Sequence, residues 1–170
     1  MQKVLVVCPA NLTSKWKIEL KTRFSEDFEI IKKKKFISYL DEIQDYPNQK
    51  LDAIISIESI RNDEIILRLK EQMPDFDLVI IDEAHKLRNK TTNQWEIGKT
   101  ISNLSQSMVM LTATPIHLGI ENLFNLLNIL DDDDFSEFYS ANERFEENKP
   151  IVKAQMCLSQ FPPNYIDAEK

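Results

Sequence analysis

Leu78-Val79-Ile80-Ile81-Asp82-Glu83-Ala84-His85 is the stretch that decides the fold, because two adjacent carboxylates directly follow four apolar residues. A continuous apolar run is typical of a strand that is buried on both faces of a parallel sheet. The carboxyl ends of such strands form the edge at which α/β proteins bind their ligands. We therefore expect Asp82 and Glu83 at that edge, where one carboxylate can hold Mg²⁺ and the other can orient an attacking water.

A second segment repeats this arrangement with hydroxyl groups in place of acids. The apolar residues from Met108 lead into Leu111-Thr112-Ala113-Thr114-Pro115. If both segments are neighbouring parallel strands, Thr112 and Thr114 lie close to the acids and can hydrogen-bond them or their bound waters. A shift at one strand end would then be felt at the other.

The rest of the chain alternates between short apolar runs and amphipathic segments, which predicts a three-layer α/β fold with a mainly parallel sheet and right-handed crossovers. The segments predicted as strands are Val4–Cys8, Glu29–Lys33, Ala53–Ile57, Leu78–Asp82 and Met108–Thr112. The segments predicted as helices are one that starts near Asn11 or Thr13 and carries Trp16, Leu20 and Phe24, then Phe36–Ile43, Glu64–Lys70, Asn93–Leu104 and Gly119–Leu130.

Composition places the chain among ordinary globular proteins, with 170 residues, 42% hydrophobic and 29% charged. It has no apolar run of roughly 18 residues that could span a membrane, and its two cysteines suggest a reducing, intracellular compartment. The net charge of −7 argues against a general nucleic-acid binder. However, residues 1–36 carry nine basic against four acidic residues, a balance of +5, which allows a local phosphate-binding face or simply a solvated loop at Lys32–Lys35.

Three blocks resemble the N-terminal RecA-like lobe of the SNF2 family of DNA-dependent ATPases, within helicase superfamily 2. The family's motif Ia is similar to Val4–Leu12 with Trp16 and Glu19-Leu20, its DEAH-type motif II to Asp77–Asn89, and its motif III to Met110–Leu130. A weaker match lies at Ile54–Ser59, and the similarity covers residues 3–130. Each block alone is a weak signal, but their order and spacing together are specific.

The resemblance implies a RecA-like P-loop NTPase fold that uses ATP and Mg²⁺. Asp82 would bind Mg²⁺ and Glu83 would position or activate the hydrolytic water. Thr112 and Thr114 would couple hydrolysis to DNA binding. His85 has two interpretations: a link between the nucleotide site and motif III, or a hydrogen-bonded structural histidine.

Sequence-independent DNA contacts are expected where the first helix begins after Pro9. Free backbone N–H groups and small polar side chains at a helix start grip phosphate without reading bases. The candidates are Asn11, Thr13, Ser14 and Lys15, together with Ser56 and Ser59. Trp16 is interpreted as a core residue rather than a base-stacking platform, because its spacing matches Leu20 and Phe24.

The phosphate-binding loop of this fold is missing from the sequence. Gly98-Lys99-Thr100 resembles its end but lies in a helical pattern after the DEAH block, so we reject it. The family's first motif would precede Met1, and a second RecA-like lobe would follow residue 170. We therefore expect an incomplete lobe at residues 1–147, lacking its first strand, and a tail or truncated region at 148–170. The missing strand would leave Met108–Thr112 as an exposed edge that favours self-association.

The sequence as a whole predicts a fragment of an ATP-dependent motor that moves on double-stranded DNA and remodels protein–DNA complexes, inactive as an isolated chain. The alternatives are another superfamily 2 helicase branch and a non-catalytic scaffold or DNA-contacting module. The expected location is intracellular: cytoplasmic in a bacterium or archaeon, and nuclear in a eukaryote.

Overall fold

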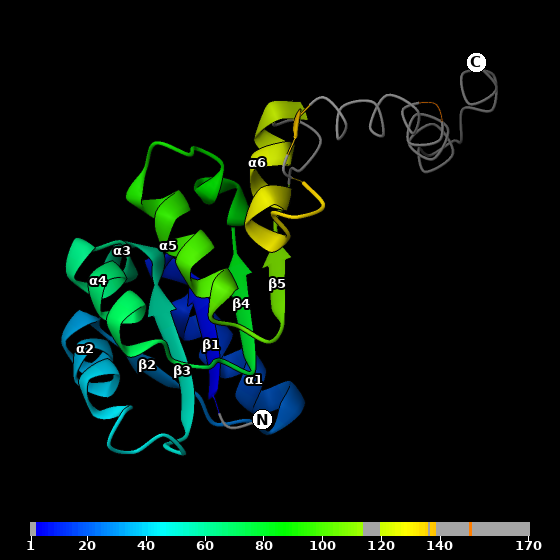
Figure 1. The fold of residues 1–170 in the computed structure, drawn as a ribbon. Helices are drawn as coiled ribbons and strands as arrows, with labels where there is room; N and C mark the ends of the chain where they lie inside the picture. The colour runs from blue at the N-terminus through cyan, green and yellow to red at the C-terminus, as the bar shows by residue number, and fades with distance from the viewer. Residues whose placement is uncertain (1–2, 114–119, 136, 139–149, 151–170) are drawn as a thin grey trace, which may run out of the picture.

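The computed structural model describes residues 3–113, 120–135, 137–138 and 150, and within them the chain forms a five-stranded, all-parallel sheet in the order β2-β3-β1-β4-β5 (Figure 1). The strands are β1 (Lys3–Cys8), β2 (Glu29–Ile31), β3 (Leu51–Ser56), β4 (Leu78–Asp82) and β5 (Met108–Leu111). Each predicted strand is present, with boundaries within two residues of the prediction. The α/β class and the parallel sheet are therefore confirmed.

Helices cover both faces of this sheet, as the three-layer prediction requires (Figure 1). One face is covered by α1 (Thr13–Phe24), which follows the 3₁₀ turn η1 (Ala10–Leu12). The other face carries α2 (Lys33–Glu42), α4 (Asp63–Gln72), α5 (Asn93–Asn103) and α6 (Ile120–Leu130). Two short elements, α3 (Ile57–Ile60) and the 3₁₀ turn η2 (Ala84–Leu87), follow the ends of β3 and β4.

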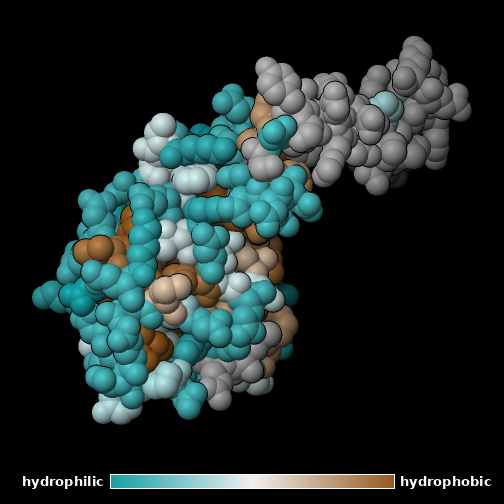
Figure 2. Space-filling model, viewed as in Figure 1, coloured by the Kyte–Doolittle hydropathy of each residue, from teal (hydrophilic) through white to brown (hydrophobic). Residues whose placement is uncertain are grey.

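The core has two layers because successive strand side chains point to opposite faces. Leu5 and Val7 of β1 face the four-helix side, where Phe36 and Phe76 are fully buried. Val4, Val6 and Cys8 face α1. The four-helix side presents mostly hydrophilic side chains to solvent, with apolar ones in small patches between them (Figure 2).

Two details of the first helix differ from the prediction. Neither Asn11 nor Thr13 caps α1, because the preceding turn η1 runs directly into it and Leu12 occupies the cap position without a side-chain bond. Phe24 is 68% exposed, so the expected Trp16–Leu20–Phe24 stripe ends at Leu20. The helix lies over strands β2 and β3, and its last turn extends beyond the apolar surface that it covers.

The two edges of the sheet differ in chemistry. At the β2 edge, Glu29 forms an ion pair of 2.5 Å with Lys35, and basic residues follow the strand. The β5 edge has no charged residue from Ser107 to Thr112, and its Val109 and Leu111 are 43% and 40% exposed. Charges at a strand edge oppose edge-to-edge pairing, so β2 carries a protection that β5 lacks among the residues that the structure describes.

Gly98 lies inside α5 and packs against Leu87 and Ile129, which confirms that the Gly-Lys-Thr match is part of a helix rather than a phosphate loop. Within the described part of the chain, no helix is long and apolar enough to cross a membrane. The predicted boundary at residues 147 and 148, and most of the tail behind it, lie outside the described residues.

Candidate functional site

The two segments that decide the prediction lie side by side. Strands β4 and β5 pair in parallel, and Asp82, the last residue of β4, is in register with Leu111, the last residue of β5. Thr112 follows immediately, so the acid pair and the first threonine reach the same edge of the sheet. Thr114 lies outside the described residues.

Glu83 holds an unusual backbone conformation that turns the chain sharply after β4. Its φ of 54° and ψ of 44° are in the left-handed region, which costs a non-glycine residue about 1–2 kcal/mol. The backbone N–H of Glu83 donates to Oδ1 of Asp82 over 2.8 Å. This turn sends the chain into η2 and separates the directions of the two carboxylates. Strain of this kind is found where a site needs a side chain in a fixed place.

His85 connects the acids to the second strand end. Its Nδ1 lies 3.1 Å from Oε2 of Glu83 and 3.5 Å from Oγ1 of Thr112. Both the histidine and the glutamate are about a quarter to a third exposed, so this contact is partly shielded from water. These contacts fit both interpretations of His85, as a link between the acids and motif III and as a hydrogen-bonded structural histidine.

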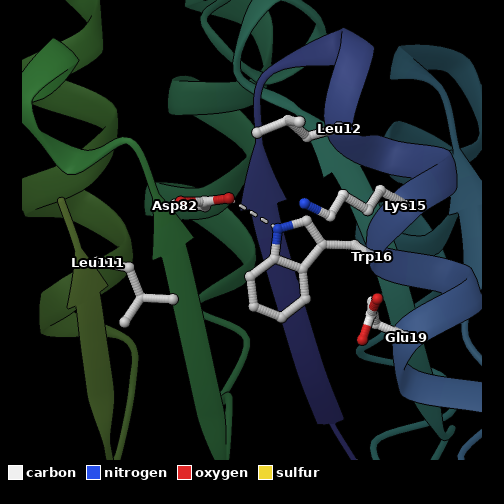
Figure 3. A pocket seen from close by; sticks show the side chains of 6 residues that line it. All are labelled: Leu12, Lys15, Trp16, Glu19, Asp82 and Leu111. Carbon is white, nitrogen blue, oxygen red and sulfur yellow. Dashed lines mark hydrogen bonds between the residues drawn. The ribbon is translucent and has the colours of Figure 1, made fainter. Parts of the chain in front are cut away.

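Trp16 contacts the site, which its interpretation as a simple core residue did not include. The indole Nε1 donates to Oδ2 of Asp82 over 2.8 Å, so α1 reaches across to the end of β4 (Figure 3). The ring is half-buried and packs at the border of the smaller core layer. Beside it lies a cavity of about 240 Å³, lined by Leu12, Lys15, Trp16, Glu19, Asp82 and Leu111.

The candidate phosphate contacts after Pro9 form a mostly exposed rim at η1 and the start of α1, and Lys15 lines the same cavity as Trp16. Asn11, Ser14 and Lys15 are exposed, whereas Thr13 is half-buried and donates its hydroxyl to the carbonyl of Ala10 over 3.0 Å. The expectation of free backbone N–H groups needs two corrections, the first being that the N–H of Leu12 donates to the carbonyl of Pro9 over 2.9 Å. The N–H of Ala10 donates to Oε2 of Glu58 over 3.1 Å, because α3 brings that carboxylate next to η1.

Ser56 and Ser59 are occupied with each other. Ser56 is buried at the end of β3, and its Oγ accepts from the N–H of Ser59 over 3.1 Å as the N-cap of α3. The same hydroxyl donates to Oγ of Ser59 over 2.9 Å. The hydroxyl of Ser56 therefore serves a local role as a cap, whereas neither bond uses the O–H group of Ser59 as a donor, so Ser59 keeps a donor for a phosphate.

Cys8 lies at the end of β1, within the electrostatic influence of Asp82 and Glu58. Its burial raises the pKa of the thiol to about 12, and the negative charges of Asp82 and Glu58 add to the same effect. The thiol is therefore neutral at physiological pH and behaves as a small apolar side chain.

The acids alone do not make a complete metal site. No cluster of three or more histidine, cysteine, aspartate or glutamate side chains suited to a metal ion occurs among the described residues. Carboxylate oxygens do suit Mg²⁺, which is commonly held by one or two carboxylates together with substrate phosphates and water. Asp82 fits that role when a nucleotide supplies the remaining oxygens.

Sequence reasoning missed two members of this site, Trp16 and Glu58. The signal for Trp16 was its position shortly after the Cys8-Pro9 strand end, which brings it toward the same edge as Asp82. The signal for Glu58 was its place in the weaker family match Ile54–Ser59, but the short helix α3 that positions its carboxylate was not predicted.

Comparisons with known proteins show which family the chain resembles. The sequence profile of the SNF2-related domain matches residues 1–160. The chain is 31% identical over 164 residues, 94% of its length, to the uncharacterized ATP-dependent helicase YqhH of Bacillus subtilis, of which it spans 26%. It is 26% identical to the RNA polymerase-associated protein RapA of Photobacterium profundum, covering 90% of this chain and 16% of that protein.

A solved structure shows the same fold. The SWI2/SNF2 ATPase core of Sulfolobus solfataricus, in complex with double-stranded DNA, superposes with a TM-score of 0.56 at 25% sequence identity. The match covers 82% of this chain and 28% of that one. The chain thus spans about a quarter of the length of YqhH and less of RapA.

The strained turn at Glu83 generates a stability prediction. We expect Glu83→Gly to be more stable than Glu83→Ala by about 1 kcal/mol, because both lose the side chain and only glycine relieves the left-handed strain. Urea unfolding followed by circular dichroism measures the difference. The matched control is Lys17, an exposed residue inside α1, where Gly should be about 1 kcal/mol less stable than Ala. Equal stabilities of the two Glu83 variants would contradict the strain.

Proposed function

The chain belongs to the SNF2-related domain family, and from this premise we propose that it forms the hydrolytic edge and one DNA-contacting surface of an ATP-dependent motor. The motor would move on double-stranded DNA and remodel protein–DNA complexes. The observation that carries this proposal is the joint position of Asp82, Glu83 and Thr112 at the end of two paired strands, with His85 between them.

Each residue has a role that follows from its place. Asp82 would help hold Mg²⁺, which neutralises the developing charge on the phosphates when it is bound. Glu83 would orient the attacking water and accept its proton. His85 and Thr112 form the connection through which a movement of the β5 end would reach Glu83. Thr114 is proposed to extend this connection.

DNA is the proposed partner of the exposed rim formed by Asn11, Ser14 and Lys15, with Thr13 behind it. The rim offers hydroxyl, amide and ammonium groups that bind phosphate without reading sequence. Ser56 and Ser59 would contribute by fixing α3, which places Glu58 against η1. A second RecA-like lobe is the proposed partner across the nucleotide.

A second candidate function is a non-catalytic, DNA-contacting module. It is favoured by the lack of a phosphate loop within the described residues, where Gly98 is helical. Both candidates share the DNA surface, and ATP turnover separates them. A Gly-Lys-Thr loop encoded within about 40 residues upstream of Met1 would favour the motor.

Binding of this chain to DNA should depend on Lys15. We expect Lys15→Ala to weaken binding to a short duplex equally for all sequences and to reduce the salt dependence by about one phosphate contact. Fluorescence anisotropy at several low salt concentrations measures both effects. Lys70→Ala is the matched control, because Lys70 is paired with Glu96 on the opposite face of the sheet. Equal losses from both variants would contradict a specific DNA rim.

ATP turnover should depend on Glu83. In a full-length motor that contains this chain, we expect Glu83→Gln to reduce DNA-stimulated ATP hydrolysis at least about 100-fold, because the amide cannot accept the proton of the water. ATP binding, measured by equilibrium dialysis, should be retained. The isolated chain should show no measurable turnover. A Glu83→Gln motor with normal turnover would remove Glu83 from this role.

Self-association is proposed through the open edge of β5. We expect a concentration-dependent dimer that Val109→Lys abolishes, because a charge on an edge strand opposes pairing with another strand. Size exclusion with light scattering measures the mass. Ile30→Lys on the protected β2 edge is the matched control and should leave the dimer intact, since Ile30 is 37% exposed and lies at the other edge. A strict monomer at high protein concentration would contradict the proposal.

A further inference from the structure

The side chain of Trp16 is the direct connection between α1 and the acid at the end of β4. Its Nε1 donates to Oδ2 of Asp82 over 2.8 Å, while Oδ1 of the same carboxylate accepts the N–H of Glu83 over 2.8 Å. Each carboxylate oxygen therefore has one donor, and the two donors come from different elements. The contact joins residues that are 66 positions apart in the chain.

Two donors of this kind determine how the carboxylate is oriented. The terminal torsion of an aspartate is broad, so a carboxylate without partners samples many orientations. The N–H of Glu83 comes from the adjacent residue and fixes one oxygen. The indole fixes the other, and hydrogen bonds to a charged acceptor are stronger than neutral ones. Each oxygen keeps a free lone pair for a further ligand.

The indole is itself held in place. Trp16 packs at the border of the smaller core layer, and Leu12 and Leu111 line the cavity beside it (Figure 3). A tryptophan has two side-chain torsions, so packing of the ring fixes the direction of its N–H group. A displacement of the start of α1 must therefore carry the indole N–H with it or break the bond.

We propose that Trp16 is a positioning residue: its indole N–H holds the carboxylate of Asp82 and transmits movement of the start of α1 to that acid. The inference rests on the proposed function for its consequence, because the rim at Ser14 and Lys15 is the proposed DNA surface and Asp82 the proposed metal ligand. The connection is separate from the one through His85 and Thr112, which reaches Glu83 rather than Asp82.

The hydrogen bond itself is tested by NMR of the chain with its indole nitrogens labelled. We expect Asp82→Ala to shift the Trp16 indole proton and to speed its exchange with solvent about tenfold, since a charge-assisted hydrogen bond is lost. Trp95 is an internal control, because its Nε1 points to the carbonyl of Asn125 instead. Glu83→Ala is the matched control and should leave the Trp16 signal in place. An unchanged Trp16 signal in Asp82→Ala would overturn the proposal.

Transmission is tested by adding a short DNA duplex to the chain with a labelled Asp82 carboxyl carbon. The NMR signals of the Ser14 and Lys15 backbone amides report DNA binding. The signal of the Asp82 carboxyl carbon reports whether the change at α1 reaches the acid. In the wild-type chain, DNA should shift both the amide signals and the carbon signal. Trp16→Phe keeps an aromatic ring but no donor, so DNA should shift its amide signals and leave the Asp82 carbon signal unchanged. An equal shift of the Asp82 carbon signal in both proteins would overturn the proposed transmission.

The two experiments separate the inference from the function that it rests on. If the duplex shifts no amide signal of α1, the proposed DNA surface is wrong, and the proposed transmission is wrong as well. The positioning of Asp82 is then still decided by the indole signal of the Asp82→Ala chain. Because that variant leaves Trp16 unchanged, the result does not depend on how well Trp16→Phe folds.

Discussion

Parallel pairing of β4 with β5 is the constraint on which the rest of the site depends. The register places Asp82 opposite Leu111, so strands β4 and β5 end at the same level of the sheet. A slip by one residue would turn every side chain of a strand to the opposite face. Asp82 would then point toward the four-helix core, where an ionised carboxylate without partners is costly. Burial of Val79 and Ile81 on that side therefore fixes the orientation of the acid.

Around this register, the end of β4, the helix α1 and the turn η2 converge on the carboxylates of Asp82 and Glu83. The left-handed turn at Glu83 sends the second acid toward His85, while the first stays within reach of α1. Each acid thus has its own protein partner: an indole for Asp82 and an imidazole for Glu83. The neighbouring thiol of Cys8 stays neutral because its pKa is raised, so it adds no third negative charge to the pair. This division suits a site in which the two acids have different tasks.

The central strands β1, β3 and β4 could be predicted from sequence because they are covered on both faces, and short continuous apolar runs such as Leu78–Ile81 are typical of strands in that position. The position of the acid pair beside Thr112 followed from the same reasoning. The contact from Trp16 could not be predicted this way. Helical spacing assigns a residue to a face, but it does not say whether the tip of a long side chain reaches a neighbouring strand. The cap of α1 and the carboxylate of Glu58 depend on the turns η1 and α3, which are too short to leave a periodic pattern.

The unlike edges of the sheet would also limit how large the proposed assembly could grow. A chain with two open edges can add copies without end, as fibrils do. If the proposed pairing at β5 takes place, Glu29 and the lysines that follow β2 would oppose growth at the other edge. Two copies joined at β5 about a two-fold axis would leave only their charged β2 edges exposed to solvent. Such an association is closed at two and does not lead to polymers.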